Sequence, residues 1–148
     1  RERTGRNQDP PFRQEHMAIA TTIDSETGAR THVVTGELTT GELLGALASV
    51  YESHDYRPQA CALWDLRGAQ LHKFDKAEIR RVADYVAANR GAPRGTCAAL
   101  VVSRDLDYGL ARMYEQMLVV STDAKTMVFR DIEEARTWLH GEREARDG

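Results

Sequence analysis

Apolar runs and amphipathic stretches alternate along most of this sequence, and the clearest unit spans residues 60–86. Residues 60–64 are continuously apolar, which is typical of a strand covered on both faces, as in a parallel sheet flanked by helices. Residues 65–68 are expected to close this strand as a loop. A helix is predicted next, with Asp75 as its cap and Glu78 completing a capping box. Its sheet-facing stripe follows helical spacing and consists of Ile79, Val82, Ala83 and Val86.

Two β-rich segments come before this unit. Residues 17–23 and 31–38 are rich in threonine, valine and isoleucine, and Gly28 between them can adopt the positive φ of a turn. The pattern therefore predicts an antiparallel hairpin. Thr39 then caps a predicted helix that has Glu42 at the capping-box position. The apolar stripe of that helix is Leu43, Leu47, Val50 and Tyr51.

The alternation continues in the second half of the chain. Residues 97–102 predict another fully apolar strand, which leads into a helix. The apolar positions of that helix are Leu106, Leu110, Met113 and Met117. Residues 118–120 are expected to leave the helix before a last strand over residues 125–129. Asp131 is predicted to cap a final helix, and Gly141 is expected to end it. The inward side of the final helix is predicted to carry Ile132, Ala135, Trp138 and Leu139.

These elements predict the order β-β-α-β-α-β-α-β-α. Strands that alternate with helices indicate an α/β fold, here a five-stranded, mostly parallel sheet with an antiparallel edge strand. A single domain over residues 17–140 accounts for the periodic part of the chain. Residues 1–16 are polar, contain two adjacent prolines and are predicted to be a disordered tail, with Met17 as an alternative start. Residues 141–148 are expected to be a charged C-terminal tail.

The composition of the chain argues against some classes of protein function. The chain has 148 residues, 41% hydrophobic and 29% charged, with a formal net charge of −3. A negative balance argues against a nucleic-acid-binding surface. No apolar run approaches the ~20 residues of a membrane span, and the first residues carry no signal-peptide pattern. A cytoplasmic location is therefore expected.

Two cysteines stand at the starts of the two apolar strands. Cys61 and Cys97 have no CxxC spacing and no neighbouring histidine cluster, which argues against a metal site. We interpret them as reduced thiols buried in the core, with a redox pair or two metal ligands as the alternative. No cofactor or metal is predicted.

Three segments together resemble the small SpoIIAA-like (STAS-like) bacterial proteins. These are residues 63–69 (Leu-Trp-Asp-Leu-Arg-Gly-Ala), residues 99–113 and residues 128–139. The resemblance covers residues 17–140 and implies a single STAS-like domain, a fold that also resembles the lipid-exchange fold of Sec14-type proteins. The family's namesake is an anti-sigma factor antagonist that is switched by serine phosphorylation at the start of the helix after the central strand. No serine or threonine occurs between Leu66 and Arg94, so this switch is not expected here.

The carboxyl ends of the parallel strands are the expected place for a ligand. Three arginines near helix N-termini would favour an anion there, such as a carboxylate, a phosphate or a lipid headgroup. The alternative is that these arginines are surface residues paired with neighbouring aspartates. The candidate ligand-binding residues are Asp65, Arg67, Ser103, Arg104, Tyr108 and Arg130.

No catalytic motif stands out, and the strongest catalytic candidate is Ser103 with His72 from a neighbouring loop. The favoured function is a non-catalytic interaction or regulatory module that binds a protein partner or a second copy of itself. The alternative is a small-ligand or lipid-binding protein, in which the helix carrying Met113 and Met117 forms an apolar wall. A pocket between that helix and the sheet would favour the alternative, and a hydrolase is the least favoured function.

Overall fold

A computed structural model describes residues 19–89, 96–122 and 124–147. Five strands form one sheet in the order β1-β2-β3-β4-β5, and β1 (Ile19–Ile23) is antiparallel to β2 (Arg30–Glu37). The strands β2, β3 (Ala62–Gln70), β4 (Cys97–Val101) and β5 (Lys125–Phe129) are parallel to one another. The predicted α/β fold, with its antiparallel edge strand, is confirmed.

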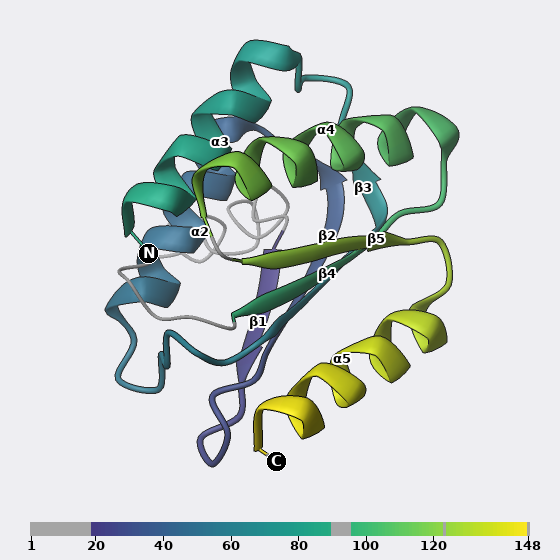
Figure 1. Cartoon of the computed structure of the whole chain (residues 1–148). Helices are drawn as coiled ribbons and strands as arrows, with labels where there is room; N and C mark the ends of the chain where they lie inside the picture. The colour runs from purple at the N-terminus through teal and green to yellow at the C-terminus, as the bar shows by residue number, and fades with distance from the viewer. Residues whose placement is uncertain (1–18, 90–95, 123, 148) are drawn as a thin grey trace, which may run out of the picture.

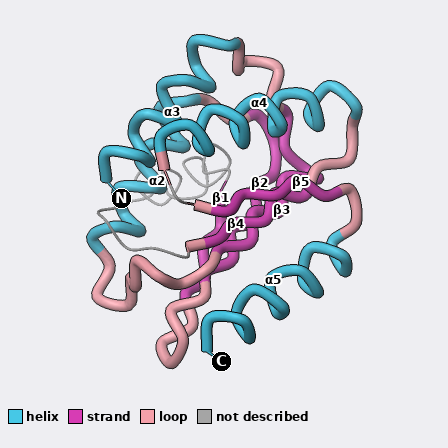
Figure 2. Tube along the Cα trace, in the orientation of Figure 1, coloured by secondary structure: helices cyan, strands magenta, loops and turns pink. Residues whose placement is uncertain are grey.

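The helices cover the two faces of the sheet unequally. Helices α2 (Thr40–Glu52), α3 (Lys76–Asn89) and α4 (Asp105–Ser121) lie side by side over one face (Figure 1). Helix α5 (Ile132–Asp147) lies on the opposite face, where it contacts β3, β4 and β5. This division follows from the topology, because crossovers of one hand between consecutive parallel strands place their helices on the same face (Figure 2). Helix α5 follows the last strand and crosses to no other.

Both faces of the central strands are buried, which explains their unbroken apolar runs. On the α5 face, Leu63, Ala99 and Val101 pack against Ala135, which is fully buried. On the other face, alternate residues of the same strands meet the three crossover helices. The buried core of that face includes Val34, Leu38, Leu47, Ala69, Leu71, Phe74, Ile79, Val82, Leu100 and Val102.

The predicted turn and helix caps are present. Gly28 has a φ of 77°, so it ends the hairpin turn in the left-handed region that glycine tolerates. Thr39 and Glu42 form a reciprocal capping box at α2. The side chain of Asp75 accepts a hydrogen bond of 2.9 Å from the Glu78 backbone N–H at the start of α3. The turn and the helix caps form as predicted because each depends on residues only a few positions apart in the chain.

Several predicted boundaries are wrong. Strand β3 does not end at residues 65–68 but continues to Gln70. The register between β2 and β3 shifts between Val33 and Thr35, and the two strands pair again from Gly68 onward. Helix α4 includes residues 118–120 and runs to Ser121. Gly141 does not end the last helix, which runs to Asp147 and so takes in most of the predicted C-terminal tail.

One apolar position was also misassigned: Leu106 is 67% exposed and so lies off the packed side of α4. The predicted disordered tail over residues 1–16 lies outside the described residues. Within the described residues, no helix is long and apolar enough to cross a membrane.

The interpretation of the cysteines as reduced thiols is wrong. Cys61 and Cys97 form a disulfide, and their Cα atoms are 4.6 Å apart. Cys97 is the first residue of β4, and Cys61 immediately precedes β3. Because β3 and β4 are adjacent and parallel, two residues at their amino ends lie side by side although 36 positions separate them in sequence. The bond ties these strand ends together.

Candidate functional site

The six predicted site residues lie at the carboxyl ends of the strands, as expected. Asp65 and Arg67 belong to β3, and the Ser103 hydroxyl donates to the backbone carbonyl of Arg67 at 3.4 Å. The Arg104 guanidinium donates to the Ala69 carbonyl at 3.2 Å, which ties the start of α4 to the end of β3. Arg130 lies over the ring of Tyr108 at 4.6 Å. The predicted residues therefore form a connected group, which we call the carboxyl-end cluster.

Each arginine of the carboxyl-end cluster contacts an aspartate. Arg67 makes a bidentate pair with Asp65, with N···O distances of 2.8 and 2.9 Å. This guanidinium lowers the pKa of the Asp65 carboxyl, chiefly through its hydrogen bonds. The two other pairs are Arg104 with Asp107 at 2.9 Å and Arg130 with Asp105 at 2.8 Å.

These contacts match the alternative in which the arginines pair with neighbouring acids. An anion at the carboxyl-end cluster would have to compete with carboxylates that the chain already supplies. Ligand binding by these six residues stays a prediction.

The two members of the proposed catalytic pair have other partners. The His72 imidazole lies 3.0 Å from a carboxylate oxygen of Glu37, and Ser103 donates to a backbone carbonyl. In the described chain these two side chains make no hydrogen bond to each other. The described residues also contain no group of three or more histidine, cysteine or acidic side chains that could hold a metal ion.

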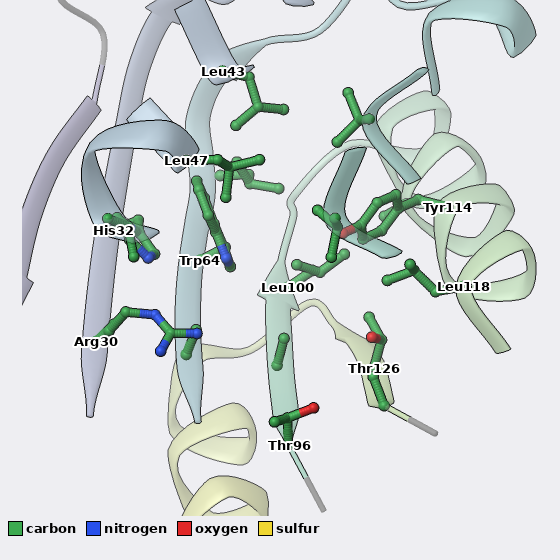
Figure 3. A pocket seen from close by; sticks show the side chains of 18 of the residues that line it. Arg30, His32, Leu43, Leu47, Trp64, Thr96, Leu100, Tyr114, Leu118 and Thr126 are labelled. Atoms are coloured by element: carbon green, nitrogen blue, oxygen red, sulfur yellow. The ribbon is translucent and has the colours of Figure 1, made fainter. Parts of the chain in front are cut away.

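A mostly apolar cavity lies elsewhere, between the sheet and the helices α2, α3 and α4. It has a volume of about 160 Å³. Its walls are mostly leucine, valine and aromatic side chains, with Leu43 and Leu47 from α2, Trp64 from β3 and Tyr114 and Leu118 from α4 (Figure 3). We call it the sheet–helix pocket. A pocket in this place is the feature that favours ligand binding over a purely protein-binding role.

Polar side chains gather at one end of the sheet–helix pocket. Arg30, Ala62, Ala98 and Thr126 are register partners across β2, β3, β4 and β5, and all line the pocket. Thr96 precedes β4 on the same side (Figure 3). These positions are at or near the first residues of their strands. The polar end of the pocket therefore lies at the amino ends of the parallel strands, opposite the carboxyl-end cluster.

His32 is the most buried polar group of the pocket wall, with 1% of its surface exposed. Its Nδ1 lies 2.8 Å from the Thr21 hydroxyl oxygen on β1, and its ring stacks on Trp64 at 3.9 Å. Burial, and to a smaller extent the charge of Arg30, lowers the pKa of His32 from 6.5 to about 3. The imidazole is therefore neutral at physiological pH.

Two further polar groups complete this end of the pocket. The Arg30 guanidinium lies 5.3 Å from the centre of the Tyr56 ring, a cation–π distance. Thr96 is 8% exposed, and its hydroxyl is buried and makes no hydrogen bond within the described chain. A buried hydroxyl without a partner costs free energy, so this group calls for a ligand or a water.

The alternation of side chains along β2 is a sequence signal for Arg30 and His32. Strand side chains alternate between faces, so Arg30 and His32 must share a face with Val34, which is fully buried. Two polar residues on the core side of a β-hairpin indicate a polar group inside the domain. Arg30 and His32 lie near Thr96 and Thr126 only because of the order of the strands in the sheet. The spacing of residues along the sequence does not specify that order.

Comparisons with known proteins agree with the architecture. No family model matches the chain, and no curated protein is similar to it. Among solved structures, it is similar to an uncharacterised protein of the DUF3478 family from Shewanella loihica PV-4, described as having a SpoIIAA-like fold. The TM-score is 0.51 at 18% sequence identity, over 82% of this chain and 92% of that one. The chain therefore has the SpoIIAA-like fold that its sequence segments predicted.

Proposed function

We propose that this protein is a non-catalytic binding module that takes a small, largely apolar molecule into the sheet–helix pocket. The observation that carries the proposal is the cavity of about 160 Å³ lined by residues of α2, α3, α4 and the sheet. Native cores have few voids larger than a water molecule, because each void loses dispersion contacts. Among the described residues, a cavity of this size between the sheet and its helices is therefore better explained by an occupant.

The size and lining of the cavity define what it can hold. A cavity of about 150 Å³ engineered into another protein binds benzene, so this pocket suits a single ring or a short acyl chain. The wall is mostly apolar with a small polar end, which is the usual composition of a small-molecule site. Trp64 lies in the wall and therefore provides a built-in reporter of occupancy.

The test uses 1-octanol as an uncharged apolar probe. The chain has two tryptophans, and Trp138 packs on the α5 face, so a Trp138→Phe background leaves Trp64 as the single emitter. Titration with 1-octanol is expected to change the Trp64 fluorescence with saturation. Ala98→Phe places a ring in the pocket wall and should weaken octanol binding at least tenfold.

The matched control is Ala20→Phe, the same change at an exposed position of β1 that pairs with Val33 rather than with a pocket residue. This variant should bind octanol as the parent does. Non-saturating fluorescence in the parent, or equal affinity of the Ala98→Phe variant, would contradict the proposed function.

The second candidate is a protein-interaction module, the function that the resemblance implies. Val119 and Val120 at the end of α4 are 65% and 86% exposed, and adjacent exposed valines favour a contact with another chain. If a second copy covers them, sedimentation should show a dimer that Val119→Lys with Val120→Lys converts to a monomer. A parent protein that stays monomeric at high concentration would contradict self-association.

The expected bacterial cytoplasm stays a prediction. The Cys61–Cys97 disulfide weighs against it, because structural disulfides are typical of oxidising compartments. Thiol labelling of the protein in its native compartment decides between the two, since a cytoplasmic protein should label at both cysteines without prior reduction.

A further inference from the structure

We infer that the ligand of the sheet–helix pocket carries an uncharged oxygen, of an alcohol or a carbonyl group, which forms a hydrogen bond with the hydroxyl of Thr96. The rest of the ligand then contacts the apolar wall. This inference rests on the proposed function, because it names the ligand class of the same pocket. The hydroxyl itself, its direction and its surroundings support the inference.

The Thr96 hydroxyl is a buried polar group without a partner. Thr96 is 8% exposed and lines the pocket, and its hydroxyl makes no hydrogen bond in the described chain. Its backbone carbonyl, in contrast, accepts a hydrogen bond of 3.0 Å from the Lys125 N–H. The sheet therefore satisfies the backbone of Thr96 and leaves its side chain unsatisfied. A ligand oxygen beside this hydroxyl would remove the cost of burying it alone.

The direction of the Thr96 side chain follows from its place before β4. Side chains alternate along an extended chain, so Thr96 shares a face with Ala98 and Leu100. Both of these residues line the pocket, and Leu100 packs against Ala111 of α4. Ala99, between them, packs on the α5 face. The hydroxyl therefore lies on the pocket side of the sheet (Figure 3).

The surroundings of Thr96 leave room for a ligand and add a second hydroxyl. Ala62 and Ala98 are register partners on β3 and β4, and both line the pocket with side chains of one methyl group. Thr126 is the register partner of Ala98 on β5 and lines the pocket as well. This end of the pocket therefore presents two threonines beside small apolar side chains.

The neutrality of the two threonines favours an uncharged head group. An ionised group held by hydroxyls would lose its hydration without gaining a counter-charge, which costs more than a hydrogen bond returns. Arg30 is the charged arginine of the described wall, but it lies on β2, which β3 separates from β4. An alcohol or carbonyl oxygen needs only the hydrogen bond that Thr96 can make.

The test uses cyclohexanol and cyclohexane, which share a ring and differ in one hydroxyl. Thr96→Val replaces the hydroxyl with a methyl group of similar size. In calorimetry on the full chain, this variant should bind cyclohexanol about fivefold more weakly than the parent, because one hydrogen bond is lost. It should bind cyclohexane at least as tightly as the parent. Each probe is compared between proteins, since water solvates cyclohexanol better than cyclohexane.

The matched control is Thr137→Val, the same substitution at an exposed position of α5 on the opposite face of the sheet. This variant should bind both probes as the parent does. An equal loss of cyclohexanol affinity in Thr137→Val would contradict a specific role of Thr96.

Cyclohexanone distinguishes the two sources of the ligand oxygen, because a ketone accepts hydrogen bonds and donates none. If Thr96→Val also weakens cyclohexanone about fivefold, the Thr96 hydroxyl is the donor and a carbonyl oxygen suffices. If only cyclohexanol is weakened, the Thr96 hydroxyl is the acceptor and the ligand is an alcohol. Either result supports the inference.

The melting temperature provides an independent measurement. Without a probe, Thr96→Val should melt at a higher temperature than the parent, because an unsatisfied buried hydroxyl has been removed. Saturating cyclohexanol should narrow this difference, and saturating cyclohexane should not. A hydroxyl satisfied by an internal water would leave the difference unchanged with both probes, which would overturn the inference.

The outcomes separate the two proposals. If cyclohexane binds and Thr96→Val does not weaken cyclohexanol, or cyclohexanol does not bind at all, the inference is overturned while the proposed function stands. If neither probe binds the parent, both fail. If Thr96→Val does not fold, Thr96→Ser, which keeps the hydroxyl, should retain the affinity for cyclohexanol that Thr96→Ala loses, and equal affinities would overturn the inference.

Discussion

At the carboxyl end of the sheet, three arginines each contact an aspartate within 3 Å, whereas at the amino end Arg30, His32 and Thr96 line a mostly apolar pocket. The first region has many charges near helix N-termini, and the sequence marks it clearly. The second has one arginine, one neutral histidine and two threonines around a cavity. The two ends of the sheet therefore differ in character: the carboxyl end carries paired charges, and the amino end carries a few polar groups around a cavity.

The difference has a structural cause. Helices α4 and α5 begin where β4 and β5 end, and helix N-termini favour aspartates in their first turn or at their cap. Asp105, Asp107 and Asp131 are such residues, and they lie close enough to the arginines to interact with them. Aspartates in the first turns or at the caps of these helices therefore supply counter-ions at the carboxyl end of the sheet.

The largest expected effect concerns the disulfide at the amino end. Replacing both cysteines, Cys61→Ala with Cys97→Ala, should lower the free energy of unfolding by about 2–4 kcal/mol, because the bond closes a loop of 36 residues in the unfolded chain. Urea denaturation measures this loss. Reductant should destabilise the parent by a similar amount and leave the double variant unchanged, and equal midpoints for all samples would contradict the prediction.

The buried histidine makes the amino end sensitive to acid. Because the folded state lowers the pKa of His32 from 6.5 to about 3, the unfolded chain takes up the proton first. The stability from this site is complete above pH 6.5 and decreases toward pH 3, by up to about 1.4 kcal/mol per pH unit.

Unfolding at pH 7 and pH 5 measures this effect, and the parent should lose about 2 kcal/mol more than His32→Gln over that interval. His72→Gln, a change at an exposed histidine paired with Glu37, should follow the parent. Parallel profiles for the parent and His32→Gln would show that His32 is not the acid-sensitive group.

The smallest effect is expected at the carboxyl end. Arg67→Met removes an exposed pair and should cost less than about 1 kcal/mol, because solvent screens the interaction. The pKa of Asp65 should rise toward its usual value, since the Arg67 guanidinium holds it down. The stability that the pair does contribute is present at neutral pH and is lost as the pH falls through the lowered pKa of Asp65.

An NMR titration of the Asp65 carboxyl measures that shift. A loss of several kcal/mol on Arg67→Met would mean that the carboxyl-end cluster is more important to the domain than its exposure indicates. An unchanged Asp65 pKa would mean that the pair seen at 2.8 Å does not persist in solution.

Much of the fold could be predicted because its signals are local. The turn at Gly28, the capping box of Thr39 and Glu42 and the alternation of strands with helices each depend on residues a few positions apart. The predicted ends of β3 and α5 are wrong because contacts with neighbouring strands outweigh these local signals. Pairing with β2 resumes at Gly68 and carries β3 to Gln70, and helix α5 continues through Gly141, where Lys125 of β5 pairs with Glu142.

The sequence by itself determined the order of the elements, the caps and the two faces of each strand, because hydrophobic periodicity and capping act within one element. Only the tertiary structure decided that Cys61 meets Cys97, that Arg30, His32 and Thr96 share one pocket wall, and that aspartates contact the arginines of the opposite edge. Each of these depends on which strands are neighbours and in what register they pair. Residues far apart in the chain become partners only once the sheet has formed.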